Sequence, residues 1–401
     1  MKQYDFIIVG AGIVGLTLAD RLITSYPEAK IALFEKEAVL GMHASGRNSG
    51  VMHSGIYYGS DTLKAKFCKE GATRMLAFAE ENGIAYRKLG KVIVATSEQE
   101  GLALSKLLEN AKNNKIEAFA IDEAGVHEYE PYARAPFGGI YCPATAVIDS
   151  PAVLNTFFNR LTKKGVAFHF NSPVFTIESG KKTLHIAKAT EKYCYGHLFN
   201  CAGTSAIRLA RFFGFAHEYE LLPFKGIYYK IKRDKDYIVR NNIYPVPDPA
   251  LPFLGVHLTR LISGDVYVGP TVIPALGQEN YGLFENINIK EVSVILKFLT
   301  TMVVQNKHNF RRLVTSEVKK YLKPYFVKAA CKLIHNLNSD DLTLASKVGI
   351  RPQLVNRHTK HLAMDFILES NEHSTHVLNA ISPAFTSSLA FVDLIVAKAG
   401  L

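Results

Sequence analysis

Hydrophobic and polar positions in the first 35 residues alternate in blocks that predict a strand, a helix and a second strand. Tyr4–Val9 is a largely apolar run, as expected of a parallel strand buried on both faces. A glycine-rich turn follows at once, and Leu16–Ser25 continues with helical spacing. Lys30–Phe34 then forms a second apolar strand. These 35 residues therefore predict a complete β-α-β unit.

The same reading of the pattern extends to the rest of the chain. Helices are expected at 99–114, from Pro151 to about Gly165, and through the basic stretch from Ile289 to about Leu344. Strands are expected at Lys91–Ala95, Val166–Phe170, Val174–Ile177, Leu198–Cys201, throughout Ile227–Val268, and again from Val348.

Segments that resemble a nucleotide-binding sheet are interrupted twice. We predict an α/β protein in which a discontinuous Rossmann-type domain (1–85, 141–215 and 346–401) binds a cofactor. The segments 86–140 and 216–345 are expected to form one inserted α+β domain, which lies over the first and binds the substrate. A length of 401 residues fits two domains better than one.

The turn after the first strand has the spacing of a dinucleotide fingerprint. Gly10 is expected to make the tight turn, Gly12 to let the backbone approach a pyrophosphate, and Gly15 to let the helix pack on the strand. The helix N-terminus would face the pyrophosphate with free N–H groups. Glu35, 20 residues after Gly15, would accept hydrogen bonds from the adenosine ribose, which argues against NADP.

Composition and charge exclude several classes of protein. A hydrophobic fraction of 48% and a charged fraction of 21% are those of a folded globular chain. The net charge of +11 favours anionic partners, such as carboxylates, phosphates or an anionic lipid surface. The basic residues are scattered, without a dense arm or recognition helix, so we expect no nucleic-acid binding.

Targeting signals and metal-binding motifs are not evident in the sequence. The longest apolar stretch, Phe6–Ala19, contains three glycines and is too short to span a bilayer. No signal or transit peptide is recognised. The five cysteines form no CxxC pair and have no His at zinc spacing, which predicts no metal site. We expect a cytoplasmic protein, with peripheral contact to the inner face of the cytoplasmic membrane as an additional expectation.

The string from His43 to Tyr58, HASGRNSGVMHSGIYY, carries a more specific signal. It resembles the flavin-side segment of the FAD-dependent amino-acid oxidase and glycerol-3-phosphate dehydrogenase superfamily. Within that superfamily, Ser60–Cys68 and the proline-rich segment Tyr244–Arg260 resemble the L-2-hydroxyglutarate oxidase/dehydrogenase family. The resemblance extends over nearly the whole chain and implies FAD as cofactor and a small anionic 2-hydroxy acid as substrate. Because no Cys or His stands at a recognisable attachment position, we expect the FAD to be bound non-covalently.

The resemblance also implies further cofactor contacts. In the flavin-side segment, small residues would let a helix start lie against the flat ring, while polar side chains supply hydrogen bonds. Asn200–Gly203 is similar to the family's second glycine turn, and Val174 to the residue whose backbone pairs with adenine. The helix N-terminus at Pro383, its expected first residue, would stabilise negative charge on the flavin, although the family's usual glycine-rich string is missing there. The expected contacts are Ser45, Asn48, Ser49, Val174, Gly203, Pro383, Ala384 and Phe385.

Oxidation of a 2-hydroxy acid requires a hydride acceptor and a base for the hydroxyl proton. Histidine is the best base, because its pKa lies near neutrality. His53, which follows the small residues of the flavin-side segment, and His257, on an expected strand of the second domain, are the candidates, and each could instead have a structural role. His43 could contact the flavin edge. The sequence does not choose among them.

Cations must hold the carboxylates of such a substrate. Arg351 resembles the arginine that binds the substrate carboxylate or borders the flavin in related oxidases, and its guanidinium offers a bidentate fork. Arg260 and Lys225 are candidates for a distal carboxylate, although the family more often has arginine at the position of Lys225. Lys64, Tyr57 and Tyr58 belong to the specific strings without an assigned role.

Three readings of function follow. The first is an FAD-dependent L-2-hydroxyglutarate dehydrogenase that passes electrons to a quinone or to oxygen. The second is a related FAD enzyme that acts on an amino acid or on glycerol-3-phosphate. The third is a flavin-binding protein without turnover.

Overall fold

The computed structural model describes residues 2–187, 191–249, 251–306 and 309–401. Its first sheet has a parallel core in the order β20–β12–β1–β2–β9. An antiparallel pair, β10 and β11, lies beside β12, and β19 pairs with β20. The strands are β1 (Lys2–Val9), β2 (Ile31–Phe34), β9 (Ala167–His169), β10 (Val174–Glu178), β11 (Thr183–Ile186), β12 (Lys192–Asn200), β19 (Leu368–Asn371) and β20 (Ser374–Val377).

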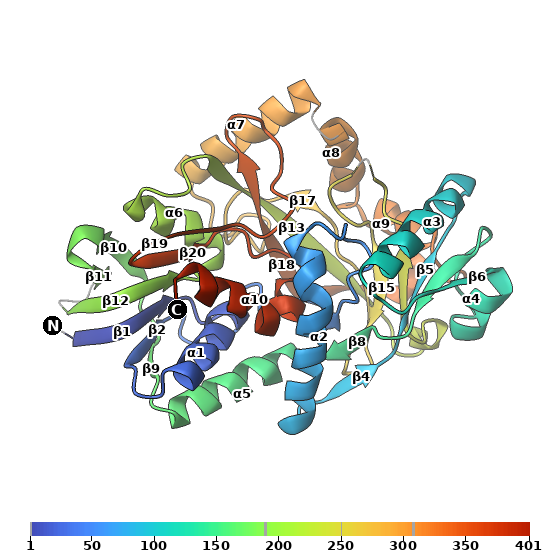
Figure 1. The fold of residues 1–401 in the computed structure, drawn as a ribbon. Coiled ribbons are helices and arrows are strands. Elements are labelled where there is room, and N and C mark those ends of the chain that lie inside the picture. Colours follow the sequence, from blue (N-terminus) through green and yellow to red (C-terminus); the bar gives the residue numbers. More distant parts are fainter. Residues whose placement is uncertain (1, 188–190, 250, 307–308) are drawn as a thin grey trace.

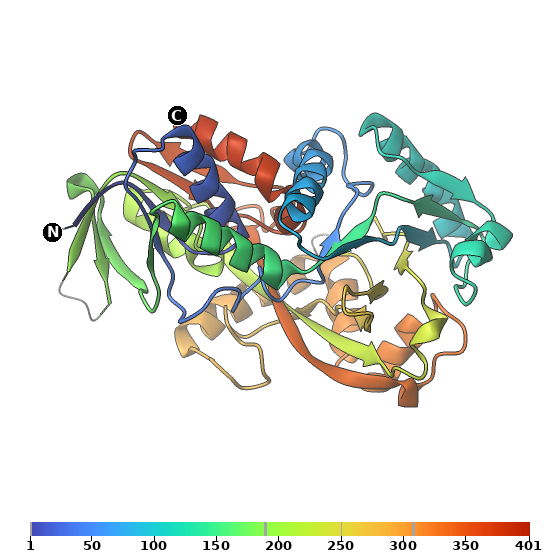
Figure 2. The ribbon, with the colours of Figure 1, turned by 90° about the horizontal axis from the view of Figure 1, so that it is seen from below.

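Four helices pack beside this sheet in the succession α5, α1, α10 and α2, and α2 in turn contacts α5 (Figures 1 and 2). Their buried faces form one core with the strands, within which Phe78 and Phe157 stack at 4.1 Å. A short helix, α6, follows β12. The bounds are α1 (Ile13–Ser25), α2 (Leu63–Glu81), α5 (Ser150–Lys163), α6 (Ala206–Ala210) and α10 (Ala384–Lys398).

The second sheet is mainly antiparallel and runs β17–β13–β16–β15–β14–β5–β7–β6, with β18 along the other edge of β13. Helices α3 and α4 lie beside β5–β7, and α7–α9 lie beyond β13 (Figure 1). The strands are β5 (Lys91–Val94), β6 (Phe119–Ile121), β7 (Gly139–Cys142), β13 (Tyr219–Ile231), β14 (Asn242–Pro245), β15 (His257–Arg260), β16 (Val266–Gly269), β17 (Ile273–Pro274) and β18 (Leu342–Asn356). The helices are α3 (Glu98–Asn113), α4 (Glu123–Tyr129), α7 (Ile289–Gln305), α8 (Phe310–Lys319) and α9 (Lys323–Ala330).

A small third sheet, β3–β8–β4, lies between the two large ones; its strands are Val51–Met52, Ala146–Ile148 and Tyr86–Lys88. The α/β fold with parallel strands and the initial β-α-β unit are thus confirmed. No helix in the described ranges is long and apolar enough to cross a membrane.

Sheet membership changes how the two-domain division should be drawn. β18 pairs with β13 from Leu342 to Asn356, so residues 346–356 lie in the second sheet and not in the first, where we expected them. β7 likewise pairs with β5 and β6. We propose that the third segment of the cofactor domain begins at about residue 357 and the second at about residue 143.

Candidate active site

The fingerprint turn between β1 and α1 is built for close approach of a ligand. Gly10 has φ +103°, and a Cβ there would lie 2.4 Å from the carbonyl oxygen of Cys201. A Cβ on Gly15 would lie 2.0 Å from the Gly10 oxygen. Helix α1 starts after Gly12 without a side-chain cap and with no acidic residue in its first turn. Ile13 N itself donates to Ser45 Oγ, so the N–H groups that follow it in the first turn are the ones that suit a pyrophosphate.

The carboxylate of Glu35 lies at this helix start. Its Oε2 accepts a hydrogen bond from Ala11 N at 3.0 Å, and its Oε1 accepts one from Glu37 N at 3.0 Å. The backbone oxygen of Glu35 accepts a hydrogen bond from Ser172 N at 2.8 Å, which brings Val174, at the start of β10, close to the same acid. This arrangement fits the expected ribose and adenine positions.

The flavin-side segment lies against the fingerprint turn. Ser45 Oγ accepts a hydrogen bond from Ile13 N at 2.9 Å. The expected helix start is wrong, because residues 41–50 form turns and bends. Asn48 is occupied within the protein: its side chain donates to Ser45 O at 2.6 Å and accepts from Gly50 N at 2.8 Å. Ser49 is partly buried beside it. Asn48 thus shapes the loop, and a direct flavin contact from its side chain loses support.

Two further turns complete the expected cofactor surface. Gly203 follows β12 with φ +55°, and a Cβ on it would meet no other atom within 4 Å. Helix α10 begins at Ala384, so Pro383 is its N-cap residue and not its first helical residue; the helix N-terminus has no side-chain cap, and Phe385 lies in its first turn. The Oγ of Ser387 in α10 is buried without a hydrogen-bond partner. The N-termini of α1 and α10, in which the N-cap residue forms no side-chain hydrogen bond, match the pyrophosphate and flavin ends of FAD.

The structure brings together the three residues expected to carry the chemistry. His53 is connected to α10, since its backbone N donates to Thr386 Oγ1 at 3.3 Å. Burial, the positive charge of Lys91 and the proximity of His257 lower the pKa of His53 to about 3. Arg351, on β18, also acts on His257 electrostatically. Residues from four distant segments therefore lie close together in what we call the buried cluster, in which Lys91 and His257 are buried and His53 and Arg351 are partly buried.

His257 is held in a defined tautomer. Its Nδ1 lies 3.0 Å from the carbonyl oxygen of Gly255, and because a carbonyl only accepts, Nδ1 carries the proton. The ring stacks on Tyr244 with centroids 4.1 Å apart, and the residue is only 8% exposed. Burial lowers the pKa of His257 to about 4, with contributions from Arg351 and Lys91. Its Nε2 is left with a lone pair that can accept a proton.

Arg351 is enclosed among aromatic residues. One guanidinium N–H donates to Thr271 O at 3.2 Å, and the guanidinium carbon lies 5.8 Å from the ring centre of Phe253. Burial lowers the pKa of Arg351, while the neighbouring Tyr228 acts in the opposite direction. A single protein acceptor leaves most of the fork available to a carboxylate.

The two residues expected at the distal carboxylate do not join this cluster. Arg260 donates to the backbone oxygens of Val239, Gly264 and Asp236, and as an even-numbered residue of β15 it faces away from His257. We therefore correct its assignment to a structural one.

Lys225 is buried and bonded by its Nζ to Asn280 Oδ1 at 3.0 Å and to Gly282 O. It is paired with Ile350, whereas Arg351 is paired with Phe224, so the two cations point to opposite faces of the sheet. Lys225 is thus also unsuited to the expected contact.

His43 does not reach the cluster either. Its Nδ1 lies 2.7 Å from Tyr281 Oη, and its Nε2 lies 2.8 Å from Glu37 Oε1. Glu37, His43 and Glu279 could be read as metal ligands, but the Nζ of Lys36 bonds to all three. An ammonium group at the centre of this network takes the place that a metal ion would need.

Sequence reasoning missed several members of the buried cluster. Lys91 places its Nζ 4.5 Å from the ring centre of Tyr57 and 5.1 Å from that of Tyr244. The hydroxyl groups of Tyr57 and Tyr244 are buried without hydrogen-bond partners. Tyr57 belonged to a recognised string without an assigned role. Lys91 gave no signal, because a lysine at the start of a strand ordinarily faces solvent.

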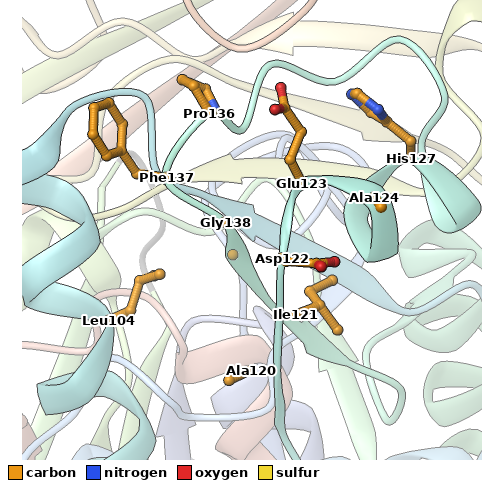
Figure 3. Close-up of a pocket in the computed structure, with 11 residues that line it drawn as sticks. Leu104, Ala120, Ile121, Asp122, Glu123, Ala124, His127, Pro136, Phe137 and Gly138 are labelled. Atoms are coloured by element: carbon orange, nitrogen blue, oxygen red, sulfur yellow. The ribbon is translucent and has the colours of Figure 1, made fainter.

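A separate open cleft of about 1040 Å³ lies at the far edge of the second sheet (Figure 3). Leu104 of α3, Glu123 and His127 of α4 and Phe137 are among the side chains that line it. None of the expected site residues borders this cleft.

Comparison with known proteins agrees with this geometry. The FAD dependent oxidoreductase family matches residues 5–397. The chain belongs to this family. FAD is its cofactor, and the N-termini of α1 and α10 are the elements that fit it. The L-2-hydroxyglutarate dehydrogenase of Salmonella houtenae is 35% identical over 99% of this chain and 93% of its own length. The human mitochondrial L-2-hydroxyglutarate dehydrogenase is 33% identical over 98% of this chain and 88% of its own length.

Solved structures show the same fold. The FAD-bound L-α-glycerophosphate oxidase of Mycoplasma pneumoniae aligns with a TM-score of 0.77 at 21% identity, covering 100% of this chain and 96% of its own. Glycine oxidase of Geobacillus kaustophilus aligns with a TM-score of 0.71 at 16% identity, covering 99% and 94%. The resemblance inferred from the flavin-side and proline-rich strings is confirmed, and this FAD-dependent oxidoreductase has the architecture of the superfamily. Ala250, in the proline-rich string, lies outside the described residues.

Proposed function

We propose that this oxidoreductase converts L-2-hydroxyglutarate to 2-oxoglutarate. The observation that carries the proposal is the buried cluster of two uncharged histidines and two cations, which suits removal of a hydroxyl proton from an anionic substrate. Relatives at 33% to 35% identity over nearly the whole chain are named for this reaction.

In this proposal His257 is the base. Its Nε2 accepts the proton of the C2 hydroxyl, while the hydrogen bond from Nδ1 to Gly255 keeps the ring in the receptive tautomer. The chemistry that FAD supplies is acceptance, at flavin N5, of the hydride released from C2. Arg351 binds the carboxylate next to C2 and orients that carbon. His53 lies beside the base as a neutral hydrogen-bonding group.

The enzyme is expected to pass its electrons on to a quinone or to oxygen. A surface that could meet a membrane carries apolar side chains among basic ones: Phe284 is 84% exposed and Ile289 is 85% exposed. We propose peripheral contact with anionic lipid there, on the inner face of the cytoplasmic membrane. Leu283 adjoins Phe284 and Lys290 adjoins Ile289 in the chain, and Lys297 is an exposed residue of the same helix, α7. Sedimentation with anionic vesicles at low and high salt tests this contact, and absence of binding at low salt would contradict it.

Anaerobic reduction of the bound flavin by a panel of acids tests the substrate. We expect L-2-hydroxyglutarate to reduce the flavin with a kcat/KM about 10- to 150-fold above that of L-2-hydroxybutyrate, since one charge-assisted contact distinguishes them. Glycine and glycerol-3-phosphate serve as controls for the related oxidase activities. Equal values for the two hydroxy acids would remove the substrate assignment, and absence of reduction by every compound would favour a flavin-binding protein without turnover.

A further inference from the structure

Lys91 is a charged residue in a position that ordinarily holds an apolar one. It is the first residue of β5 and shares a strand face with Ile93, which packs into the core formed by Ile56 and Tyr244. The lysine is 1% exposed. The alternation of side chains along β5 therefore directs the Lys91 side chain into this core, where it extends toward the buried cluster.

The ammonium group of Lys91 has no anionic partner among the residues that the structure describes. Across the described residues, its Nζ forms no ion pair and no hydrogen bond, and its contacts are the faces of Tyr57 and Tyr244. The groups that favour its charge are the thiols of Cys142 and Cys68, with no carboxylate among them, and burial lowers its pKa. Aromatic faces stabilise a cation only modestly, so most of the desolvation cost remains uncompensated.

Two other buried lysines of this protein have nearby groups that stabilise their ammonium charge, as expected of structural lysines. Lys225 bonds to Asn280 and Gly282, and Lys64 has the carboxylate of Asp365 acting in favour of its charge. Lys91 lacks such groups although it is the most enclosed of the three. A buried cation without a partner is retained at a cost, which points to a ligand that provides the missing anion.

The surroundings of Lys91 indicate which part of a ligand it would meet. The Nζ of Lys91 lies 5.1 Å from the ring centre of Tyr244, and the other partner of that ring is His257, which stacks on it at 4.1 Å. The charge of Lys91 accordingly acts on His257 and His53, and that of Arg351, on strand β18, acts on His257. His257 is thus under the influence of two separate cations. A substrate with its reacting hydroxyl at His257 and a carboxylate at each end would satisfy both cations at once.

We infer that Lys91 binds the distal carboxylate of the substrate, while Arg351 binds the carboxylate next to the reacting carbon. This inference rests on the proposed function. It gives Lys91 the role of distal carboxylate ligand that we had expected for Arg260 or Lys225, whose contacts within the protein do not suit that role. Lys91 is then a determinant of selectivity for dicarboxylates over monocarboxylates.

The test uses the FAD-loaded enzyme and two unreactive probes, glutarate and butyrate, whose binding is followed by the absorbance of the flavin. Lys91→Met should weaken glutarate binding by about 10- to 150-fold and change butyrate binding by less than about threefold, because only the distal contact is lost. Lys91→Arg should restore part of the glutarate affinity. Lys88→Met, at an exposed position of β4, is the matched control and should bind both probes as the wild type does.

A second readout separates ligand binding from a structural role. Because the unpartnered ammonium is costly, Lys91→Met should melt, without ligand, at a temperature no lower than the wild type, and glutarate should no longer raise that temperature. Equal loss of both probes, no loss of either, or failure of the variant to fold and load FAD would each overturn the inference. If wild type does not oxidise L-2-hydroxyglutarate yet glutarate binding depends on Lys91, only the proposed function fails.

Discussion

The depressed pKa of His257 gives a pH profile that differs from that of an ordinary histidine. The base acts in its neutral form, and its pKa of about 4 means that more than about nine-tenths of it is neutral at pH 5.5. A histidine with the usual pKa of about 6.5 would be only about one-tenth neutral at that pH. We therefore expect kcat/KM at pH 5.5 to be within about 10% of its value at pH 7. The substrate carboxylates, with pKa values of about 4.3, also remain ionised.

The assay is the initial rate of L-2-hydroxyglutarate oxidation from pH 4 to pH 8. His257→Gln should lose about 10²- to 10⁴-fold in kcat/KM with normal FAD content, because glutamine accepts no proton. Arg351→Met should move the acid limb upward, since its positive charge helps to lower the pKa of His257. An acid limb near pH 6.5 in the wild type would refute the assignment of an enclosed neutral base.

At acid pH, a fall in the rate can result from unfolding of the protein as well as from protonation of His257, so the two effects must be measured separately. The folded-state pKa values of His53 and His257 lie below the unfolded value of 6.5. The unfolded chain therefore binds more protons below about pH 6.5, and the free energy of unfolding falls as the pH drops from there toward 4. Melting temperatures at each pH, with rates measured well below them, provide the control.

Three further substitutions test the rest of the site. Gly12→Val should yield a folded protein without FAD. A Cβ at this position would already lie 3.0 Å from Ser45 Oγ, and the branched side chain would occupy the pyrophosphate position. The flavin absorbance of the purified variant measures its FAD content, and a normal content would contradict the prediction. Arg351→Lys should lower kcat/KM by about tenfold or more for both L-2-hydroxyglutarate and L-2-hydroxybutyrate, since both lose the fork at the reacting end, and an effect on one acid alone would contradict this. Arg260→Met should destabilise by about 1–3 kcal/mol, seen as a lower melting temperature, and leave the ratio of kcat/KM for the two acids unchanged; a changed ratio would restore Arg260 to the substrate site.

The elements that follow from local chemistry could be predicted from the sequence. The fingerprint turn and Glu35 lie within one β-α-β unit, so spacing alone predicted their neighbourhood. His53 was recognised because it lies in the flavin-side segment, and His257 because it lies on an expected strand of the second domain. Pro383 was misplaced by one position, since proline is common both at a helix cap and just inside the helix.

The parts that depend on long-range packing could not be predicted in the same way. Nothing near Lys91 in the sequence tells that Tyr57 and Tyr244 enclose it. The hydrophobic pattern from Val348 onward identified a strand, which is β18, but it could not decide which sheet this strand joins. Residues 346–356 were therefore assigned to the first sheet, whereas they pair with β13 of the second. Arg260 was a plausible contact for the substrate carboxylate, but the structure shows that its guanidinium donates to backbone carbonyl oxygens of nearby loops.

The order of strands in the first sheet has a consequence for synthesis of the protein. β20 and α10 complete the cofactor surface, yet they follow the whole second sheet in the chain. A nascent chain that has emerged only as far as β12 presents the fingerprint turn, while the strand beside β12 and the helix beside α1 are still to be made. FAD capture on the ribosome should therefore come late, after the 173 residues between β12 and β20 have been synthesised and can fold.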